Sequence, residues 1–305
     1  MGLTSRDKRD IYYRLAKSNG WRARSAYKLM QIQEHFNIFK DVSKVVDLCA
    51  APGSWSQVIT SELHTKHEDP SQVRIVAVDL QPMAPLPGVI QLKGDITEES
   101  TAEAIIGHFD GQKADLVVCD GAPDVTGLHA FDEFLQGQLV FAAFNISTFV
   151  LKEGGTFVSK VFLAGDGVLL KTQMSLFFKH VDFYKPQSSR ISSSESFIVC
   201  REYQPPAGYT PNLKNILHSP DYERAKEDLK DINKAVVPFM CCGDLSGFDS
   251  ERSFDLDTKG LLDQLRDKLG SVELKEGLRA VAPPTEPAYK EALEKKKTGL
   301  LDRPV

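Results

Sequence analysis

The chain has 305 residues, 42% of them hydrophobic and 26% charged, with a formal net charge of −5 at pH 7. It contains no apolar run of about eighteen residues, and its N-terminus is polar and basic rather than signal-like. Membrane-spanning and secreted classes are therefore disfavoured, and we expect a soluble cytoplasmic protein with one sizeable core. Its five cysteines and seven histidines lack metal-ligand or disulfide spacing, so the sequence predicts no metal site.

The charge is unevenly distributed along the chain. Residues 1–45 hold ten basic and four acidic residues, a net charge of +6, which leaves −11 for the remainder. This asymmetry predicts one positive face for a polyanion on an otherwise acidic body. A solvated helix face is the alternative, because charged helices are common.

The first predicted elements are helices within residues 5–38. Arg22, Arg24 and Lys28 lie where two amphipathic stretches meet, close to tyrosines. Guanidinium and aromatic groups together suit phosphate contact and base stacking on RNA, so these three residues are the predicted RNA contacts.

The next stretch reads Asp-Leu-Cys-Ala-Ala-Pro-Gly-Ser-Trp over residues 47–55 and follows an apolar pair. It predicts a buried strand that turns sharply into a helix, with Gly53 allowing a ligand close to the backbone. The dinucleotide spacing GxGxxG is missing, and Trp55 stands where a pyrophosphate would need open backbone. A smaller adenosine ligand fits better, with an ordinary strand-to-helix turn as the alternative.

Further apolar runs predict strands and alternate with helical patterns. The strands are expected at 74–80, 89–95, 114–120, 155–162, 182–185 and 195–200, and the helices at 98–108, 132–150 and 167–180. This alternation predicts an α/β, Rossmann-like fold with a mostly parallel seven-stranded sheet and helices on both faces.

Three of these strands end in an acid: Asp79, Asp95 and Asp120. Because carboxyl ends of parallel strands line the ligand crevice, we expect the three carboxylates to converge on the ligand held by the Gly53 loop. Asp79 is placed to accept from ribose hydroxyls and Asp95 from an adenine amine. Each acid alone is better explained as a turn or N-cap residue, but the three together, with Gly53 and Trp55, favour cofactor binding.

The chain divides into three predicted parts. Residues 1–45 form a basic helical RNA-binding segment, 46–203 a catalytic core and 204–305 a C-terminal extension. The extension is punctuated by prolines and holds isolated apolar clusters such as 236–240. It either packs on the catalytic core or becomes ordered on a partner.

Four residues are not required by an adenosine pocket: Lys28, Asp120, Lys160 in a strand, and Glu195 after a serine-rich turn. With the motifs DLCAAPGSW, DGAPDVTG and KPxSSRxxSxE, they make residues 5–203 resemble the FtsJ-type RNA ribose 2′-O-methyltransferases. The resemblance implies S-adenosylmethionine as cofactor and a Lys-Asp-Lys-Glu tetrad. By analogy, Lys160 is the base, Asp120 orients it beside the cofactor, and Lys28 and Glu195 position the reactants.

Among these proteins the chain is most similar to the eukaryotic cytoplasmic tRNA anticodon-loop subgroup, through YYRLAKSNGWRARSAYKL, AVDLQPMAPLPGVIQLKGDIT and VPFMCCGDLS in the extension. That similarity implies methylation of tRNA nucleotides 32 and 34 with separate auxiliary subunits. Relatives often carry a more basic loop at the position of residues 163–167. The loop of this chain is less suited to RNA contacts.

Chemistry explains why a lysine would be used. The enzyme must align an in-line displacement and remove one hydroxyl proton. A lysine is a base only when neutral, a form that burial and Lys28 favour and that Asp120 and Glu195 oppose. Which influence wins stays open at this point.

Other functions remain as alternatives. They are an rRNA or mRNA-cap ribose methyltransferase, a non-catalytic RNA-binding subunit with a dead cofactor pocket, and a nicotinamide oxidoreductase. The intact tetrad disfavours the non-catalytic subunit, and the missing GxGxxG disfavours the oxidoreductase.

Overall fold

The computed structural model describes residues 10–66, 72–123, 126, 129–163, 167–190, 193–212 and 228–242. The chain divides into two compact units, Met1–Ser246 and Gly247–Val305, and every described residue lies in the first. None of the helices described there has the length and apolar character needed to cross a bilayer.

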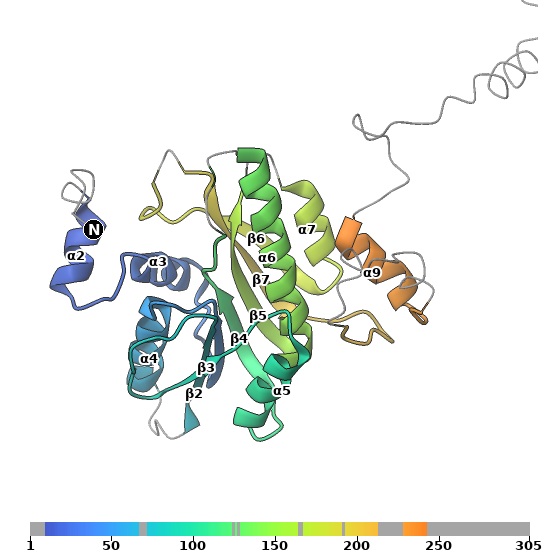
Figure 1. Ribbon diagram of the computed structural model, residues 1–305, viewed down its shortest axis with the longest axis horizontal. Coiled ribbons are helices and arrows are strands. Elements are labelled where there is room, and N and C mark those ends of the chain that lie inside the picture. Colours follow the sequence, from blue (N-terminus) through green and yellow to red (C-terminus); the bar gives the residue numbers. More distant parts are fainter. Residues whose placement is uncertain are drawn as a thin grey trace, which may run out of the picture. The chain divides into compact units, whose positions relative to one another are not determined.

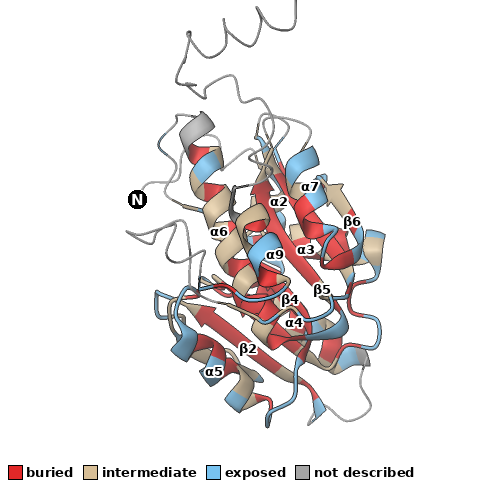
Figure 2. Cartoon of the chain, turned by 90° about the vertical axis from the view of Figure 1, so that its right-hand side faces the viewer, coloured by how far each residue is buried: buried red, intermediate tan, exposed pale blue. Residues whose placement is uncertain are grey.

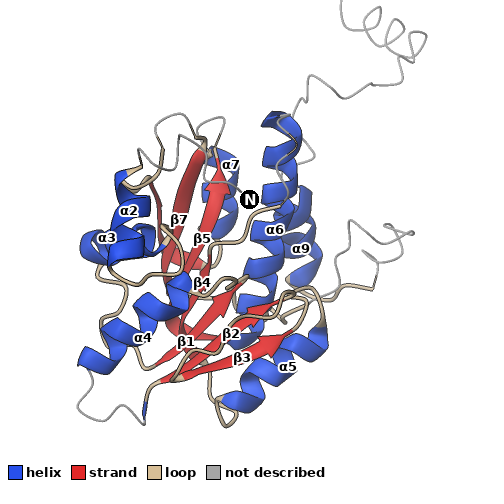
Figure 3. Cartoon of the chain, turned by 60° about the vertical axis from the view of Figure 1, so that its left-hand side comes forward, coloured by secondary structure: helices blue, strands red, loops and turns tan. Residues whose placement is uncertain are grey.

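A seven-stranded sheet with the order β3-β2-β1-β4-β5-β7-β6 forms the centre of this unit (Figures 1 and 3). The strands β1 to β5 pair in parallel, whereas β7 is antiparallel to both β5 and β6. Their bounds are β1 Lys44–Leu48, β2 Arg74–Asp79, β3 Val89–Lys93, β4 Ala114–Cys119, β5 Leu151–Phe162, β6 Phe178–Tyr184 and β7 Glu195–Tyr203. The predicted mostly parallel sheet is confirmed.

Helices cover both faces of the sheet, with α3 and α4 on one side and α5, α6 and α9 on the other (Figure 3). The helices are α2 Ile11–Ser18, α3 Ala26–Phe36, α4 Ser54–Lys66, α5 Glu99–His108, α6 His129–Val150, α7 Val168–Met174 and α9 Asn233–Cys242. Asp10 caps α2 by accepting a hydrogen bond from the Tyr13 amide. Residues 19–25 separate α2 from α3, so the predicted helical region is two short helices.

Side chains alternate between two apolar cores, as period-two strands buried on both faces require. In β1, Val46 packs in the core beneath α5 and α6, whereas its neighbour Val45 packs with α3 and α4. Figure 2 shows the central strands β2 and β4 as almost continuously buried, whereas the edge strand β6 is only partly buried. The sheet edge at the strand carboxyl ends is thereby held rigidly between two packed layers.

One predicted element is wrong in part. The helix expected at 167–180 ends at Met174, and residues 178–184 form strand β6 instead. The apolar spacing around Phe177 and Phe178 suits either state, but pairing with β7 satisfies the backbone there. Phe178 is buried beside Tyr203 of β7, so tertiary packing overrides the helical pattern.

The start of the predicted C-terminal extension packs on the catalytic core. Val236 and Met240 of α9 are buried in the core beneath α6, and Gln173 of α7 donates hydrogen bonds to the Phe239 and Met240 carbonyls. Val236 and Met240 are therefore covered by the chain itself, which favours packing on the core, one of the two alternatives expected for this cluster. Further along the extension, the sequence pattern at 260–269 predicts a helix, but it lies outside the described residues.

Candidate active site

The turn after β1 forms the floor of the predicted cofactor site. Its backbone takes positive φ angles at Cys49 (53°) and Gly53 (99°), and α4 begins at the next residue, Ser54. A Cβ at Gly53 would lie 2.6 Å from Nη1 of Arg22, and the positive φ would strain any L side chain at this position. The free N–H groups of the first α4 turn point from this edge of the sheet.

Trp55 contributes to this site differently from what its position in the motif indicates. Its side chain is only 2% exposed and packs against Phe197, with its indole N–H donating to the Ser25 carbonyl over 2.9 Å. Because Trp55 is the second residue of α4, the group it can offer a ligand is its backbone N–H.

Two of the strand-end acids organise the turns that follow them. Asp79 accepts hydrogen bonds from the amides of Ala51 (2.8 Å) and Gln81 (2.7 Å). Asp95 accepts from the amide and hydroxyl of Thr97. The turn role and the ligand role are compatible, since each carboxylate has about four acceptor positions.

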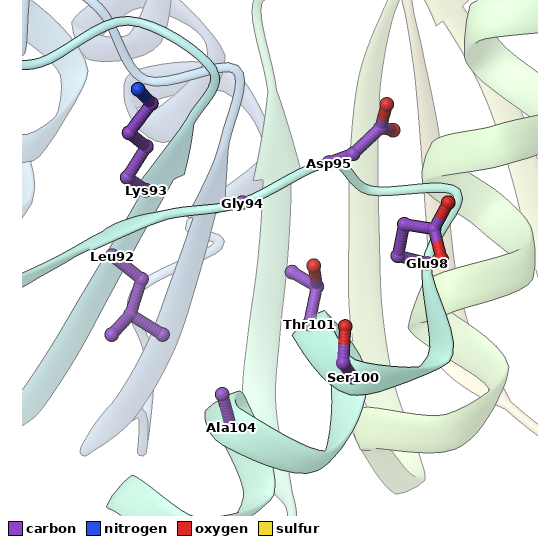
Figure 4. A pocket seen from close by; sticks show the side chains of 8 residues that line it. All are labelled: Leu92, Lys93, Gly94, Asp95, Glu98, Ser100, Thr101 and Ala104. Atoms are coloured by element: carbon purple, nitrogen blue, oxygen red, sulfur yellow. The ribbon is translucent and has the colours of Figure 1, made fainter.

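A pocket of about 200 Å³ opens beside Asp95 (Figure 4). It is lined by the end of β3 and the start of α5, through Leu92, Lys93, Gly94, Asp95, Glu98, Ser100, Thr101 and Ala104. Sites for whole ligands occupy roughly 300–1,000 Å³. This pocket can therefore take only part of a nucleoside ligand.

Asp47, the next-to-last residue of β1, is a buried acid to which the sequence interpretation gave no role. It is 1% exposed, its Oδ2 accepts from the Ser56 hydroxyl over 2.6 Å, and its buried Oδ1 has no protein partner. Burial raises the pKa of Asp47 to about 7 despite the Ser56 hydrogen bond, and the charges of Asp120 and Asp79 raise it further. The signal available in the sequence was a charged residue inside an apolar strand, and Lys160 gives the same signal.

The catalytic residues predicted from the sequence form two ion pairs. In the first, Nζ of Lys160 on β5 donates to the Asp120 carbonyl (2.7 Å) and to its Oδ1 (3.0 Å). Lys160 is only 8% exposed. The carboxamide of Gln136 on α6 donates to the backbone carbonyls of Lys160 (2.7 Å) and Gly121 (3.2 Å), which fixes both strand ends together.

In the second ion pair, Nζ of Lys28 lies 2.6 Å from Oε2 of Glu195, and its charge sits 5.8 Å from the Phe197 ring centre. The Ser189 hydroxyl donates to the other carboxylate oxygen of Glu195 over 2.7 Å. Burial raises the pKa of Glu195, but Lys28, the Ser189 hydrogen bond and Lys160 outweigh it and hold the pKa below its usual value. Glu195 is therefore a charged anchor.

The serine-rich turn before β7 is fastened to α3. The amide and hydroxyl of Ser188 both donate to Oε1 of Gln31, and the Arg24 guanidinium donates to the Ser188 carbonyl. Arg24 also pairs with Asp10. These contacts bring Lys28, one turn before Gln31, to Glu195.

The predicted RNA contacts thus all engage protein groups. Arg22 donates to the carbonyls of Pro52 and Pro85, Arg24 to Asp10 and Ser188, and Lys28 to Glu195. An RNA phosphate that contacts one of these side chains would therefore have to share or replace a hydrogen bond to the protein.

The residues at this edge suit an adenosine cofactor with an amino acid tail. Carboxylates at Asp79 and Asp95 match hydroxyl and amine donors, and the unpartnered Oδ1 of Asp47 can accept from a buried donor. In the part of the chain that the structure describes, no cluster of His, Cys, Asp and Glu could hold a metal ion.

A Rossmann-like sheet with a nucleoside crevice and a buried Lys–Asp pair at one edge defines a group-transfer enzyme of the methyltransferase class. Residues 21–203 match the family described as FtsJ-like methyltransferase. The chain belongs to this family.

Relatives with similar length extend the comparison beyond the family domain. The chain is 52% identical to the human tRNA (cytidine(32)/guanosine(34)-2′-O)-methyltransferase, over 100% of this chain and 88% of the relative. It is 47% identical to the Schizosaccharomyces pombe protein of the same description, over 99% and 100%. A Plasmodium falciparum crystal structure described as a ribosomal RNA methyltransferase shares the fold, with 25% identity, a TM-score of 0.52 and coverage of 60% of this chain and 98% of that one.

Proposed function

We propose that this protein transfers the methyl group of S-adenosylmethionine to ribose 2′-hydroxyls of the tRNA anticodon loop, at nucleotides 32 and 34. The observation that carries this function is the intact tetrad, two ion pairs at the cofactor edge of the sheet. The chain that carries this tetrad is also about 50% identical, along nearly its whole length, to proteins described as tRNA (cytidine(32)/guanosine(34)-2′-O)-methyltransferases.

The cofactor supplies an electrophilic methyl group, so the protein has to orient the ribose and remove its proton. Lys160 is the base. A neutral lysine amine has two N–H bonds, which match its two contacts on Asp120, and its lone pair then points elsewhere, free for a hydroxyl proton. Asp120 thereby sets the direction of the lone pair.

Lys28 and Glu195 act as positioning residues beside this base. Their ion pair is nearly buried, with side-chain exposures of 11% and 14%. It is therefore a fixed part of the wall of the site and not a mobile surface contact. Glu195 opens β7 opposite Phe162 of β5, two residues from Lys160. The pair therefore fixes the strand that carries the base.

Two alternatives fit less well. A rRNA methyltransferase of Aspergillus fumigatus is 41% identical over only 68% of this chain, which spans 26% of that much longer protein. A non-catalytic subunit would have no need of a buried lysine held by two hydrogen bonds to one aspartate.

Substrate presentation completes the proposal. The basic segment 1–45 contributes to tRNA binding, through exposed cations such as Arg14 and Lys17 on one side of α2. Separate auxiliary subunits select nucleotide 32 or 34, and the enzyme works in the cytoplasm. The overall charge of −5 supports a second subunit that holds the tRNA body.

The test is to map ribose methylation on tRNA from cells that lack the protein and from cells that express it again. Loss of 2′-O-methyl groups at nucleotides 32 and 34, restored by the wild-type chain and not by Lys160→Ala, is the expected result. Unchanged tRNA together with a lost ribose methyl group in rRNA would support the rRNA alternative instead.

A further inference from the structure

We propose that Arg22 is a positioning residue that clamps the cofactor-binding turn, and that this contact, rather than an RNA phosphate, is its main role. The inference rests on the proposed function for the identity of the cofactor. The clamp is part of a strap, residues 20–25, which connects α2 to α3 and runs across the turn that follows β1.

The guanidinium of Arg22 joins two separate loops of the sheet edge. Nη1 donates to the Pro52 carbonyl over 3.0 Å, in the turn after β1, and Nη2 donates to the Pro85 carbonyl over 2.9 Å, in the loop after β2. Asp79 connects to both loops, because it ends β2 and accepts a hydrogen bond from the Ala51 amide in the turn after β1. The planar guanidinium has two terminal nitrogens and can bridge two carbonyls. The single ammonium of a lysine, on a flexible side chain, is poorly suited to do so.

Gly53 shows how closely the clamp is seated. Nη1 of Arg22 would lie only 2.6 Å from a Cβ at this position, so the guanidinium rests against the glycine backbone. The glycine in the motif is thus explained by the arginine as well as by its positive φ. Any movement of Arg22 toward an RNA phosphate would uncover this turn.

The strap around Arg22 is fixed to the first turns of α4 by four further contacts. The Arg22 amide donates to Oε1 of Gln57 (2.8 Å), and Nε2 of Gln57 donates to the Gly20 carbonyl (3.2 Å). The Trp55 indole N–H donates to the Ser25 carbonyl (2.9 Å), and the hydroxyls of Ser25 and Ser54 lie 2.6 Å apart. The strap and the cofactor turn therefore form one hydrogen-bonded unit.

This unit leads directly into the tetrad, since α3 begins at Ala26 and carries Lys28 in its first turn. A guanidinium already oriented by two carbonyls loses those hydrogen bonds if it turns to a phosphate. Arg14, by contrast, is exposed on α2 and makes a suitable comparison.

The experiment compares Arg22→Gln and Arg22→Lys with the control Arg14→Gln, each checked for a wild-type melting temperature. S-adenosylmethionine affinity is measured by calorimetry without RNA, and tRNA affinity is measured as a function of salt. Both Arg22 variants should bind the cofactor about tenfold more weakly, the effect of one lost net hydrogen bond. Their salt slope should equal that of wild type, whereas Arg14→Gln should lower the slope by about one and leave cofactor affinity unchanged.

Hydrogen exchange of the free protein separates the clamp from the proposed cofactor. Amides of residues 50–57 should exchange faster in Arg22→Gln than in wild type even without ligand, whatever cofactor the enzyme uses. Unchanged exchange with normal cofactor affinity would overturn the clamp. A second outcome would also overturn the clamp. In it, Arg22→Lys binds the cofactor with wild-type affinity, and Arg22→Gln lowers the slope of log tRNA affinity against log salt by about one.

Discussion

Nζ of Lys28 lies 2.6 Å from Oε2 of Glu195, although 167 residues separate them in the chain. One residue belongs to α3, next to the basic segment, and the other opens β7 beside the strand of the catalytic lysine. The ion pair thus joins the predicted RNA-binding segment to the catalytic strand. Its geometry depends on the serine-rich turn, because Ser189 holds the other oxygen of Glu195.

Replacing Ser189 by alanine should lower methyl transfer by about tenfold, as expected for one lost hydrogen bond to a charged group. Cofactor affinity should be unchanged, because Ser189 contacts the carboxylate of Glu195 and not the Gly53 turn. Single-turnover transfer and calorimetry measure the two quantities.

Two companion variants make the Ser189 result specific. Ser189→Thr keeps the hydroxyl and should restore most of the rate, whereas Ser175→Ala, which removes a hydroxyl bonded within α7, should leave the rate near wild type. Equal rates for Ser189→Ala and wild type would show that the Glu195 anchor does not need this bond.

The raised pKa of Asp47 predicts that the free energy of unfolding of the protein depends on pH. Its pKa is about 7 in the folded chain against an ordinary value of 3.8. Below pH 3.8 the group is protonated in both states; as the pH rises toward 7, only the unfolded chain gives up the proton, so stability is lost over this window. Above pH 7 the loss is complete and amounts to about 4 kcal/mol.

Asp47→Asn removes this titration while keeping an acceptor for Ser56. The free energy of unfolding of the variant relative to wild type should therefore increase between pH 4 and pH 7, as measured by urea unfolding without cofactor. A difference that stays constant over this range would mean that Asp47 is ionised normally in the folded chain.

Asp79→Ala should weaken S-adenosylmethionine binding by two routes. It removes an acceptor for ribose hydroxyls and also frees the Ala51 amide, which Asp79 holds in the cofactor turn. Asp79→Asn keeps one acceptor oxygen, so its loss of affinity should be smaller. Calorimetry that gives wild-type affinity for Asp79→Ala would remove this residue from the cofactor site.

The sequence predicted the sheet well because the sheet depends on local patterns, whereas the tetrad was inferred from the family resemblance. Apolar runs that end in Asp79, Asp95 and Asp120 locate the carboxyl edge, and Lys160 stands out as a cation inside an apolar strand. The helix predicted at 167–180 extends too far because spacing alone does not reveal that the strand expected at 182–185 begins at Phe178 and pairs along β7.

The contacts that position the site could not be predicted, because they join segments far apart in the sequence. Arginines at 22 and 24 look alike in a basic stretch, but one holds the Pro52 turn and the other holds the Ser188 turn. Trp55 likewise gave no local sign that its side chain faces Phe197 in the core. Only tertiary packing distinguishes these roles from surface contacts.

The central claim is that Lys160 removes the ribose proton, and single-turnover transfer from labelled S-adenosylmethionine to tRNA tests it most directly. The wild-type enzyme, with any auxiliary subunit present, should label the 2′-oxygens of nucleotides 32 and 34. Lys160→Ala should bind the cofactor with wild-type affinity and lose transfer by about a hundredfold or more, since only the proton-removal step is affected. Transfer by Lys160→Ala at a near-normal rate would contradict the account.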